Sequence, residues 1–103
     1  MSMYVGNIVA SGTLVLSGSS AVQLPAEARS LDMVTCATFD VEGGPIRFWV
    51  HGEDPTALEG HPVLEDDSRT IVGGGNVQQL RMIAQDPVGG AVVTWSVGTG
   101  AML

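Results

Sequence analysis

The sequence consists of short apolar runs that are interrupted, roughly every ten residues, by glycine- or proline-containing turn signals. Within the runs, apolar and polar residues alternate with the period of two that is typical of strands. No segment repeats its apolar residues with the 3.6-residue period of an amphipathic helix. The pattern predicts an all-β fold: a single antiparallel β-sandwich or jelly-roll-like barrel of about seven to eight short strands, with negligible helix.

A length of 103 residues is typical of one domain, and a hydrophobic content of 45% supplies enough apolar side chains for one core. We therefore expect one β-sandwich domain over residues 1–103. Residues 1–10 fit an extended N-terminal arm as well as an ordered first strand. No N-terminal signal sequence is recognisable, and no apolar run reaches the ~18 residues of a membrane span, so no membrane association is expected.

The expected strands follow from the alternation and from the turn signals between them. They cover residues 11–18, 21–24, 30–39, 46–51, 62–64, 69–72, 77–84 and 91–97. Pro25 should make the second of these a short edge strand, because proline lacks the N–H that a ladder needs. Residues 25–29 fit one helical turn. In the last strand, Trp95 is expected to be a core anchor.

Two glycine-containing segments are expected to be turns. Residues 40–45 end in Gly43, Gly44 and Pro45, and glycine readily takes positive φ angles, so we expect a hairpin that joins strands 30–39 and 46–51. Residues 73–76, with the sequence GGGN, are expected to form a flexible bend. They do not fit a phosphate-binding loop, because no Lys-Ser/Thr pair follows and no helix is expected there.

The strand at residues 46–51 places three candidate interface residues on one face. Arg47, Trp49 and His51 share that face, while the other face is apolar. Arginine and tryptophan are enriched among residues that dominate binding energy at protein interfaces. His51 has no metal-ligating neighbour in its strand, and His61 is the only other histidine, so a metal or general-base role is disfavoured. The sequence predicts no catalytic, cofactor-binding or metal-binding residue.

Carboxylates gather in the loop of residues 53–67. Helix-loop calcium sites need acids at alternating positions around a glycine, whereas Glu65, Asp66 and Asp67 are consecutive, so a solvated turn is the preferred interpretation. Cys36 is the only cysteine, which rules out an intramolecular disulfide. It lies in an apolar strand without neighbouring positive charge and is expected to be a buried small hydrophobic residue rather than a reactive thiol.

The charge balance limits the partners. Eleven acidic residues stand against four arginines and no lysine, which gives a formal net charge of -7. Binding to a phosphate backbone needs basic side chains, so nucleic acid is an improbable partner. An acidic surface instead suits a basic protein partner. An enzyme is also disfavoured, because no serine or cysteine has a paired histidine at a recognisable spacing.

Five segments carry a resemblance to a known class of proteins. They are GPIRF at 44–48, HGEDPT at 51–56, EGHPVL at 59–64, VQQLRMI at 77–83 and VVTWSV at 92–97. This succession resembles small virion structural proteins of tailed bacteriophages, over roughly residues 21–97. Val63 and the three acids that follow Leu64 depart from the usual "P-L-x-x-G-D" form.

The resemblance implies a non-enzymatic, cofactor-free subunit, most simply a head decoration or cement protein that binds and stabilises the capsid. Its expected partners are the major capsid protein or other virion proteins and further copies of itself, with a trimer as the favoured form. Its expected location is the capsid surface, after assembly in the host cytoplasm. The alternative is a phage tail or appendage module that binds a carbohydrate through Trp49, or calcium through residues 65–67.

Overall fold

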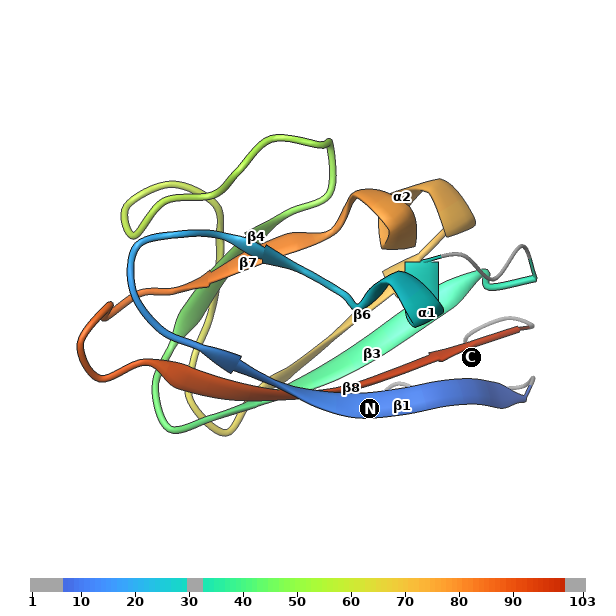
Figure 1. Ribbon diagram of the computed structural model, residues 1–103, viewed down its shortest axis with the longest axis horizontal. Coiled ribbons are helices and arrows are strands. Elements are labelled where there is room, and N and C mark those ends of the chain that lie inside the picture. Colours follow the sequence, from blue (N-terminus) through green and yellow to red (C-terminus); the bar gives the residue numbers. More distant parts are fainter. Residues whose placement is uncertain (1–6, 30–32, 100–103) are drawn as a thin grey trace.

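The structure is a computed structural model, which describes residues 7–29 and 33–99. Two four-stranded antiparallel sheets pack face to face (Figure 1). The first sheet has the order β1 (Ile8–Leu16), β8 (Ala91–Gly98), β3 (Cys36–Glu42), β6 (Ser68–Val72), and the second has the order β2 (Val22–Gln23), β7 (Arg81–Ala84), β4 (Ile46–Trp49), β5 (His61–Val63). Two short helices complete the described elements, α1 (Ala26–Arg29) and α2 (Gly74–Gln79).

The strands pair in a nested way. β1 pairs with β8, β2 with β7, β3 with β6 and β4 with β5, so the chain runs out and back as one long double strand. Two further pairs, β3 with β8 and β4 with β7, roll this double strand into two facing sheets. This is the strand order of an eight-stranded jelly roll. The predicted all-β sandwich is therefore confirmed, and its strand number lies within the expected range.

The core lies between the two sheets and is built from the inward side chains of both. Trp95 of β8 and Phe39 of β3 are the largest fully buried side chains. Phe39 meets Phe48 of the opposite sheet edge-to-face, with ring centroids 5.5 Å apart. Such pairs stabilise beyond the area that they bury, so this contact links the two layers. The prediction that Trp95 is a core anchor is confirmed, since it is 2% exposed.

The expected hairpin between residues 30–39 and 46–51 is wrong. β3 pairs with β6 and β8, whereas β4 pairs with β5 and β7, so the residues between them carry the chain from one sheet to the other. Gly43 has the expected positive φ of 79°, and Gly44 passes so close to Gly90 that a Cβ would lie 2.5 Å from its carbonyl oxygen. Alternation sets which face of a strand is buried, but it does not say in which sheet the next strand lies.

The expected bend at residues 73–76 is also wrong. Residues 74–79 form α2, and the side chain of Val77 in this helix is buried. Asn76 Nδ2 donates to the Val72 carbonyl at 2.9 Å. Strand β7 therefore begins at Arg81 rather than at residue 77. Six residues are too few for a helical period to show in the sequence.

Other strand limits differ less from the prediction. β3 begins at Cys36 and runs to Glu42, and residues 30–32 lie outside the described part. β1 begins at Ile8, so the end of the proposed arm 1–10 is strand, while residues 1–6 are outside the described part. The turn at residues 25–29 is confirmed as α1, and β2 is an edge strand as expected. Neither described helix has the length and apolar character of a membrane span.

Candidate functional site

The loop between β4 and β5, residues 50–60, lies over the outer face of the second sheet (Figure 1). Ile83 of β7 pairs with Arg47 of β4 on that outer face, yet it is only 4% exposed. Pro55 of the loop is buried as well. The chain therefore covers the outer face of its second sheet with its own loop.

Arg47 fixes this loop to the sheet. Its Nε donates to the carbonyl of Ala57 at 3.1 Å, and its Nη1 donates to the carbonyl of Gly60 at 2.9 Å. A guanidinium presents several donors in a fixed plane, which suits two separate carbonyls. Arg47, a candidate interface residue from the sequence, is thus partly buried and bonded within the chain.

The other two candidates, Trp49 and His51, lie together in an aromatic cluster with His61. The Trp49 ring centroid is 4.9 Å from that of His51 and 5.1 Å from that of His61, both edge-to-face. Trp49 is partly buried, whereas His51 is exposed. The indole is enclosed by its own neighbours on two sides, which leaves only part of it open as a binding platform.

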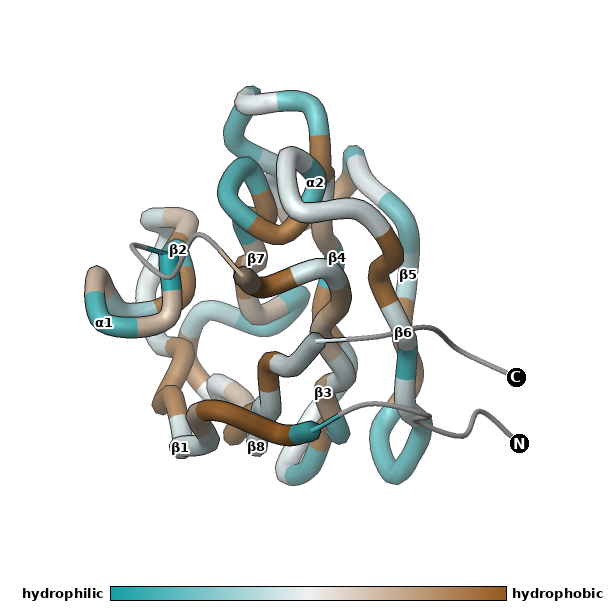
Figure 2. Tube along the Cα trace, turned by 90° about the vertical axis from the view of Figure 1, so that its right-hand side faces the viewer, coloured by the Kyte–Doolittle hydropathy of each residue, from teal (hydrophilic) through white to brown (hydrophobic). Residues whose placement is uncertain are grey.

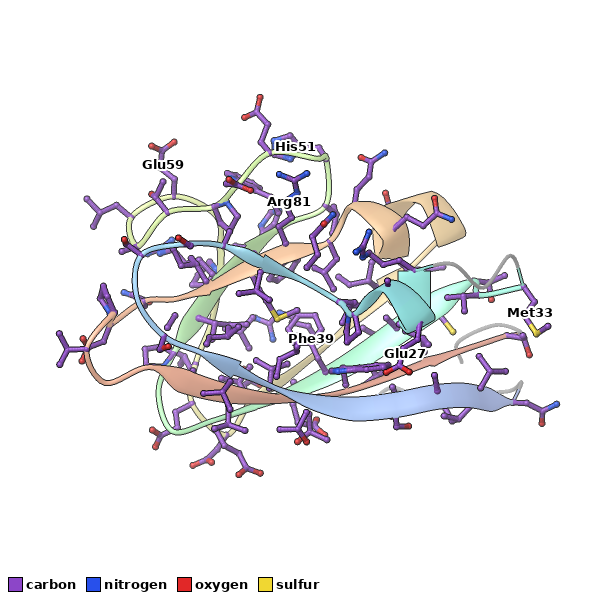
Figure 3. All side chains as sticks on the ribbon, viewed as in Figure 1. Glu27, Met33, Phe39, His51, Glu59 and Arg81 are labelled. Carbon is purple, nitrogen blue, oxygen red and sulfur yellow. The ribbon has the colours of Figure 1, made fainter. Side chains whose placement is uncertain are left out.

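An ion pair connects the loop to β7, and a second polar contact lies within the loop, between Glu53 and His51 of the aromatic cluster. Arg81 Nη1 donates to Asp54 Oδ1 at 2.7 Å, and His51 Nε2 lies 3.6 Å from Glu53 Oε2. Figure 3 shows His51 at the top of the loop, Arg81 below it on the side of the sheet, and Glu59 farther along the loop. All the carboxylates in these pairs are well exposed, so each pair adds little to stability. The pairs orient the loop, while the Arg47 bonds hold it.

Residues 65–67 form a turn, as expected from the sequence. Asp66 has a φ of 66°, and its N–H donates to the Val41 carbonyl at 2.7 Å. The Asp67 carboxylate accepts the N–H of Ser68. Among residues 7–29 and 33–99, no group of three or more histidine, cysteine or acidic side chains is placed to hold a metal ion, and no pocket is found.

Cys36 is buried, as predicted, with 1% exposure. Its Sγ lies 3.7 Å from the Gly98 carbonyl oxygen. The thiol therefore packs at the junction of β3 and β8.

The outer face of the first sheet is open, and the register places hydroxyl side chains on it in rows. One row contains Ser11, Ser96, Thr38 and Thr70, and the next contains Thr13, Thr94, Asp40 and Ser68. Within the first row, the Oγ atoms of Ser11 and Ser96 are 3.0 Å apart, and the Oγ1 atoms of Thr38 and Thr70 are 3.4 Å apart. We call these eight residues the hydroxyl face. Asp40 carries its only formal charge, so the face is close to neutral.

Charged residues are distributed unevenly along the chain, and in the fold the two uncharged ends of the chain lie side by side. Every acidic residue and arginine lies between Glu27 and Asp86. The first and last strands pair with each other, so β1 and β8 form a two-stranded region without a charged side chain. Figure 2 shows the start of β1 as a hydrophobic stretch at the lower side of the molecule, with hydrophilic loops at the top and at the lower right of the view. The uncharged stretches at the two ends are visible in the sequence, but only the nested pairing places them together.

Replacing Arg47 with lysine should release the loop. A lysine offers one compact charge and cannot donate to both carbonyls as the guanidinium does. The loss of one hydrogen bond of about 1 kcal/mol corresponds to about fivefold more frequent loop opening. A protease that cuts after glutamate, with sites at Glu53 and Glu59, should therefore cleave Arg47→Lys about fivefold faster than the original chain.

Arg29→Lys is the matched control, since Arg29 Nε also donates to a backbone carbonyl, that of Leu24, at a distance from the loop. Its loop should be cleaved at the original rate. Equal cleavage of Arg47→Lys and the original chain would show that Arg47 does not hold the loop.

Comparison with protein-family models, with curated proteins and with solved structures gave no match to this chain.

Proposed function

We propose that this chain is a non-enzymatic structural protein of a bacteriophage virion, a head decoration subunit that binds the capsid shell through its hydroxyl face. The observation that carries the proposal is the contrast between the two outer faces. The second sheet is covered by residues 50–60, which Arg47 holds in place. The first sheet has an open outer face whose two central rows are the eight short side chains of the hydroxyl face, one of them charged, and Val15, Val92 and Glu42 form the next row.

The hydroxyl face has properties that suit burial against another protein. Interface cores are depleted in charged residues, and seven of its eight side chains are serine or threonine. Serine and threonine are short, so ordering them on binding costs less side-chain entropy than ordering lysine, arginine or glutamine.

The rest of the molecule supports the same orientation on a shell. The acidic loop of residues 50–60 lies on the opposite side, over the second sheet, where solvent keeps its charges hydrated, whereas the acidic turn of residues 65–67 lies beside β3 at the border of the hydroxyl face. Jelly rolls recur among viral shell proteins as well as lectins, which supports the proposal by fold-level analogy only. The sequence resemblance to phage virion proteins points in the same direction. In this proposal the partners are the major capsid protein and further copies of the chain, on the capsid surface.

Replacing Thr94 with lysine should abolish shell binding. Thr94 is exposed in the interior strand β8, in the middle of the hydroxyl face. A lysine there is much longer than threonine and would hold the two surfaces apart, even if its charge is paired with Asp40 opposite it on β3, so we expect affinity for expanded capsids of the encoding phage to fall at least about tenfold. Co-sedimentation with such capsids measures this.

His51→Lys is the control, because it places the same side chain at an exposed position on the opposite side of the molecule. It should bind capsids like the original chain, and both variants should keep the original circular-dichroism spectrum. Loss of binding with His51→Lys and not with Thr94→Lys would contradict the proposed face. Calorimetric titration with calcium and with glycans tests the alternative binding module, and the proposal expects no heat in either case.

A further inference from the structure

Among the described strands, β1 forms one edge of the first sheet and pairs only with β8. An edge strand presents a row of backbone N–H and C=O groups that are free to pair with another strand. β1 is the longest strand of the fold, with nine residues, and its sequence IVASGTLVL contains no charge and no proline. It also carries three exposed aliphatic side chains, Ile8, Val9 and Val15.

The other three edges are blocked against pairing. β2 has two residues and is followed by Pro25, and β5 has three residues, of which one is Pro62. β6 carries Arg69, whose Nη1 lies 3.4 Å from Asp67 Oδ2 and whose Nη2 reaches the Pro62 carbonyl of the other sheet. Short length, proline and charge are the means by which soluble β-proteins prevent edge pairing. β1 is not short and has neither proline nor charge. Its pairing with β8 has one irregularity, between Ile8 and Ala10.

Charge also favours β1 as the contact between two copies. Each copy carries a formal net charge of -7, so two copies repel each other wherever their acidic residues approach. β1 and its neighbour β8 carry no charged side chain, and the acids and arginines all lie in the segment from Glu27 to Asp86. An approach along β1 therefore brings together the parts of the two molecules that repel least.

We infer that a second copy of this chain pairs its β1 antiparallel with β1, so that two first sheets join into one continuous eight-stranded sheet. Pairing of an edge with itself is a two-fold, closed contact, and its product is a dimer rather than the trimer favoured from the sequence. The hydroxyl faces of the two copies then lie on the same side of the joined sheet. The inference uses the strand edge and not the hydroxyl face, so it stands or falls separately from shell binding.

A lysine at Val15 tests the inference. Val15 is 72% exposed on β1, and Val72 is a similarly exposed valine at 59% on β6, the opposite edge of the same sheet. In analytical ultracentrifugation the original chain should sediment at twice its 10.7 kDa monomer mass. Val15→Lys should sediment as a monomer, with dimer affinity reduced at least about tenfold, because a lysine on an edge strand opposes its pairing with another strand. Val72→Lys should remain a dimer.

Backbone hydrogen exchange gives a second readout that does not depend on a variant. On dilution of the original chain, the amides of β1 should exchange faster, because its free edge is uncovered when the dimer separates. The amides of β6 should not respond to dilution. A monomeric original chain with concentration-independent β1 exchange would overturn the inference, as would loss of the dimer in Val72→Lys but not in Val15→Lys. Neither result would bear on whether Thr94→Lys binds capsids.

Discussion

Trp95→Ala is expected to lower the free energy of unfolding by about 3–5 kcal/mol, the range for truncation of a fully buried aromatic side chain. Trp95 is 2% exposed and lies in β8, which is hydrogen-bonded to β1 on one side and to β3 on the other. Strands on both sides limit how far the surroundings can collapse into the cavity. Because a small domain has only about 5–15 kcal/mol of stability in total, this one change could unfold the chain.

The residue opposite Trp95 on β1 is a glycine, and the indole ring occupies the space that a side chain there would need. Gly12 of β1 pairs with Trp95, and a Cβ at Gly12 would lie 2.8 Å from the indole Cζ2. The ring therefore lies across the backbone of β1. The indole Nε1 is buried and has no hydrogen-bond partner within the described chain, so the side chain stabilises through packing alone.

Urea denaturation of Trp95→Ala and Trp49→Ala gives a matched comparison of the two tryptophans. Trp49 is partly exposed at the end of β4, and its truncation should cost clearly less than that of Trp95. If the free energy of unfolding falls equally in the two variants, or falls more in Trp49→Ala, then Trp95 of β8 is not the central residue of the core. Circular dichroism at low temperature reports whether each variant still folds.

Gly90→Ala should cost about 2–5 kcal/mol, from two separate effects. Gly90 has a φ of 70°, and for any other L-residue that conformation costs roughly 1–2 kcal/mol. A Cβ there would also lie 2.6 Å from the carbonyl oxygen of Leu16, a backbone atom that cannot turn away, and overpacking of this kind costs about 1–3 kcal/mol. Thermal unfolding should show a correspondingly lower midpoint.

Gly18→Ala separates the two effects, because Gly18 has a similar φ of 74° and a Cβ added there would meet nothing within 4 Å. It should show the conformational cost without the clash. A loss of stability in Gly90→Ala no greater than in Gly18→Ala would mean that the turn before β8 does not press against the end of β1. Gly90 matters for the topology as well, since its carbonyl is the group that Gly44 passes where the chain changes sheet.

The strands are largely predictable from the sequence, and their connections are not. Alternation in residues such as Val93, Trp95 and Val97 predicts which side chains point inward, because burial of one sheet face imposes a period of two. The same alternation is produced by a strand that pairs with its predecessor and by one that faces it across the core. The pattern therefore predicts a hairpin where Gly43 and Gly44 in fact carry the chain to the other sheet. It does not reveal α2, because the single buried anchor of that helix, Val77, also fits a strand.

The candidate site is predictable only in part. The sequence correctly places Arg47 and Trp49 on the face of β4 away from the core, but it does not show that the chain's own loop covers that face. Two carbonyls, of Ala57 and Gly60, decide the role of Arg47, and backbone groups of a loop leave no pattern in the sequence. The hydroxyl face also escapes a sequence-based prediction, since it is assembled from four strands that are far apart along the chain.

The most direct measurement is electron cryomicroscopy of expanded capsids incubated with the protein, at a resolution that distinguishes the two sheets. We expect added density with the first sheet against the shell, the loop of residues 50–60 directed to solvent, and copies joined in pairs along β1. Capsids without added density, or a sandwich attached through the loop and the Trp49 cluster, would contradict it.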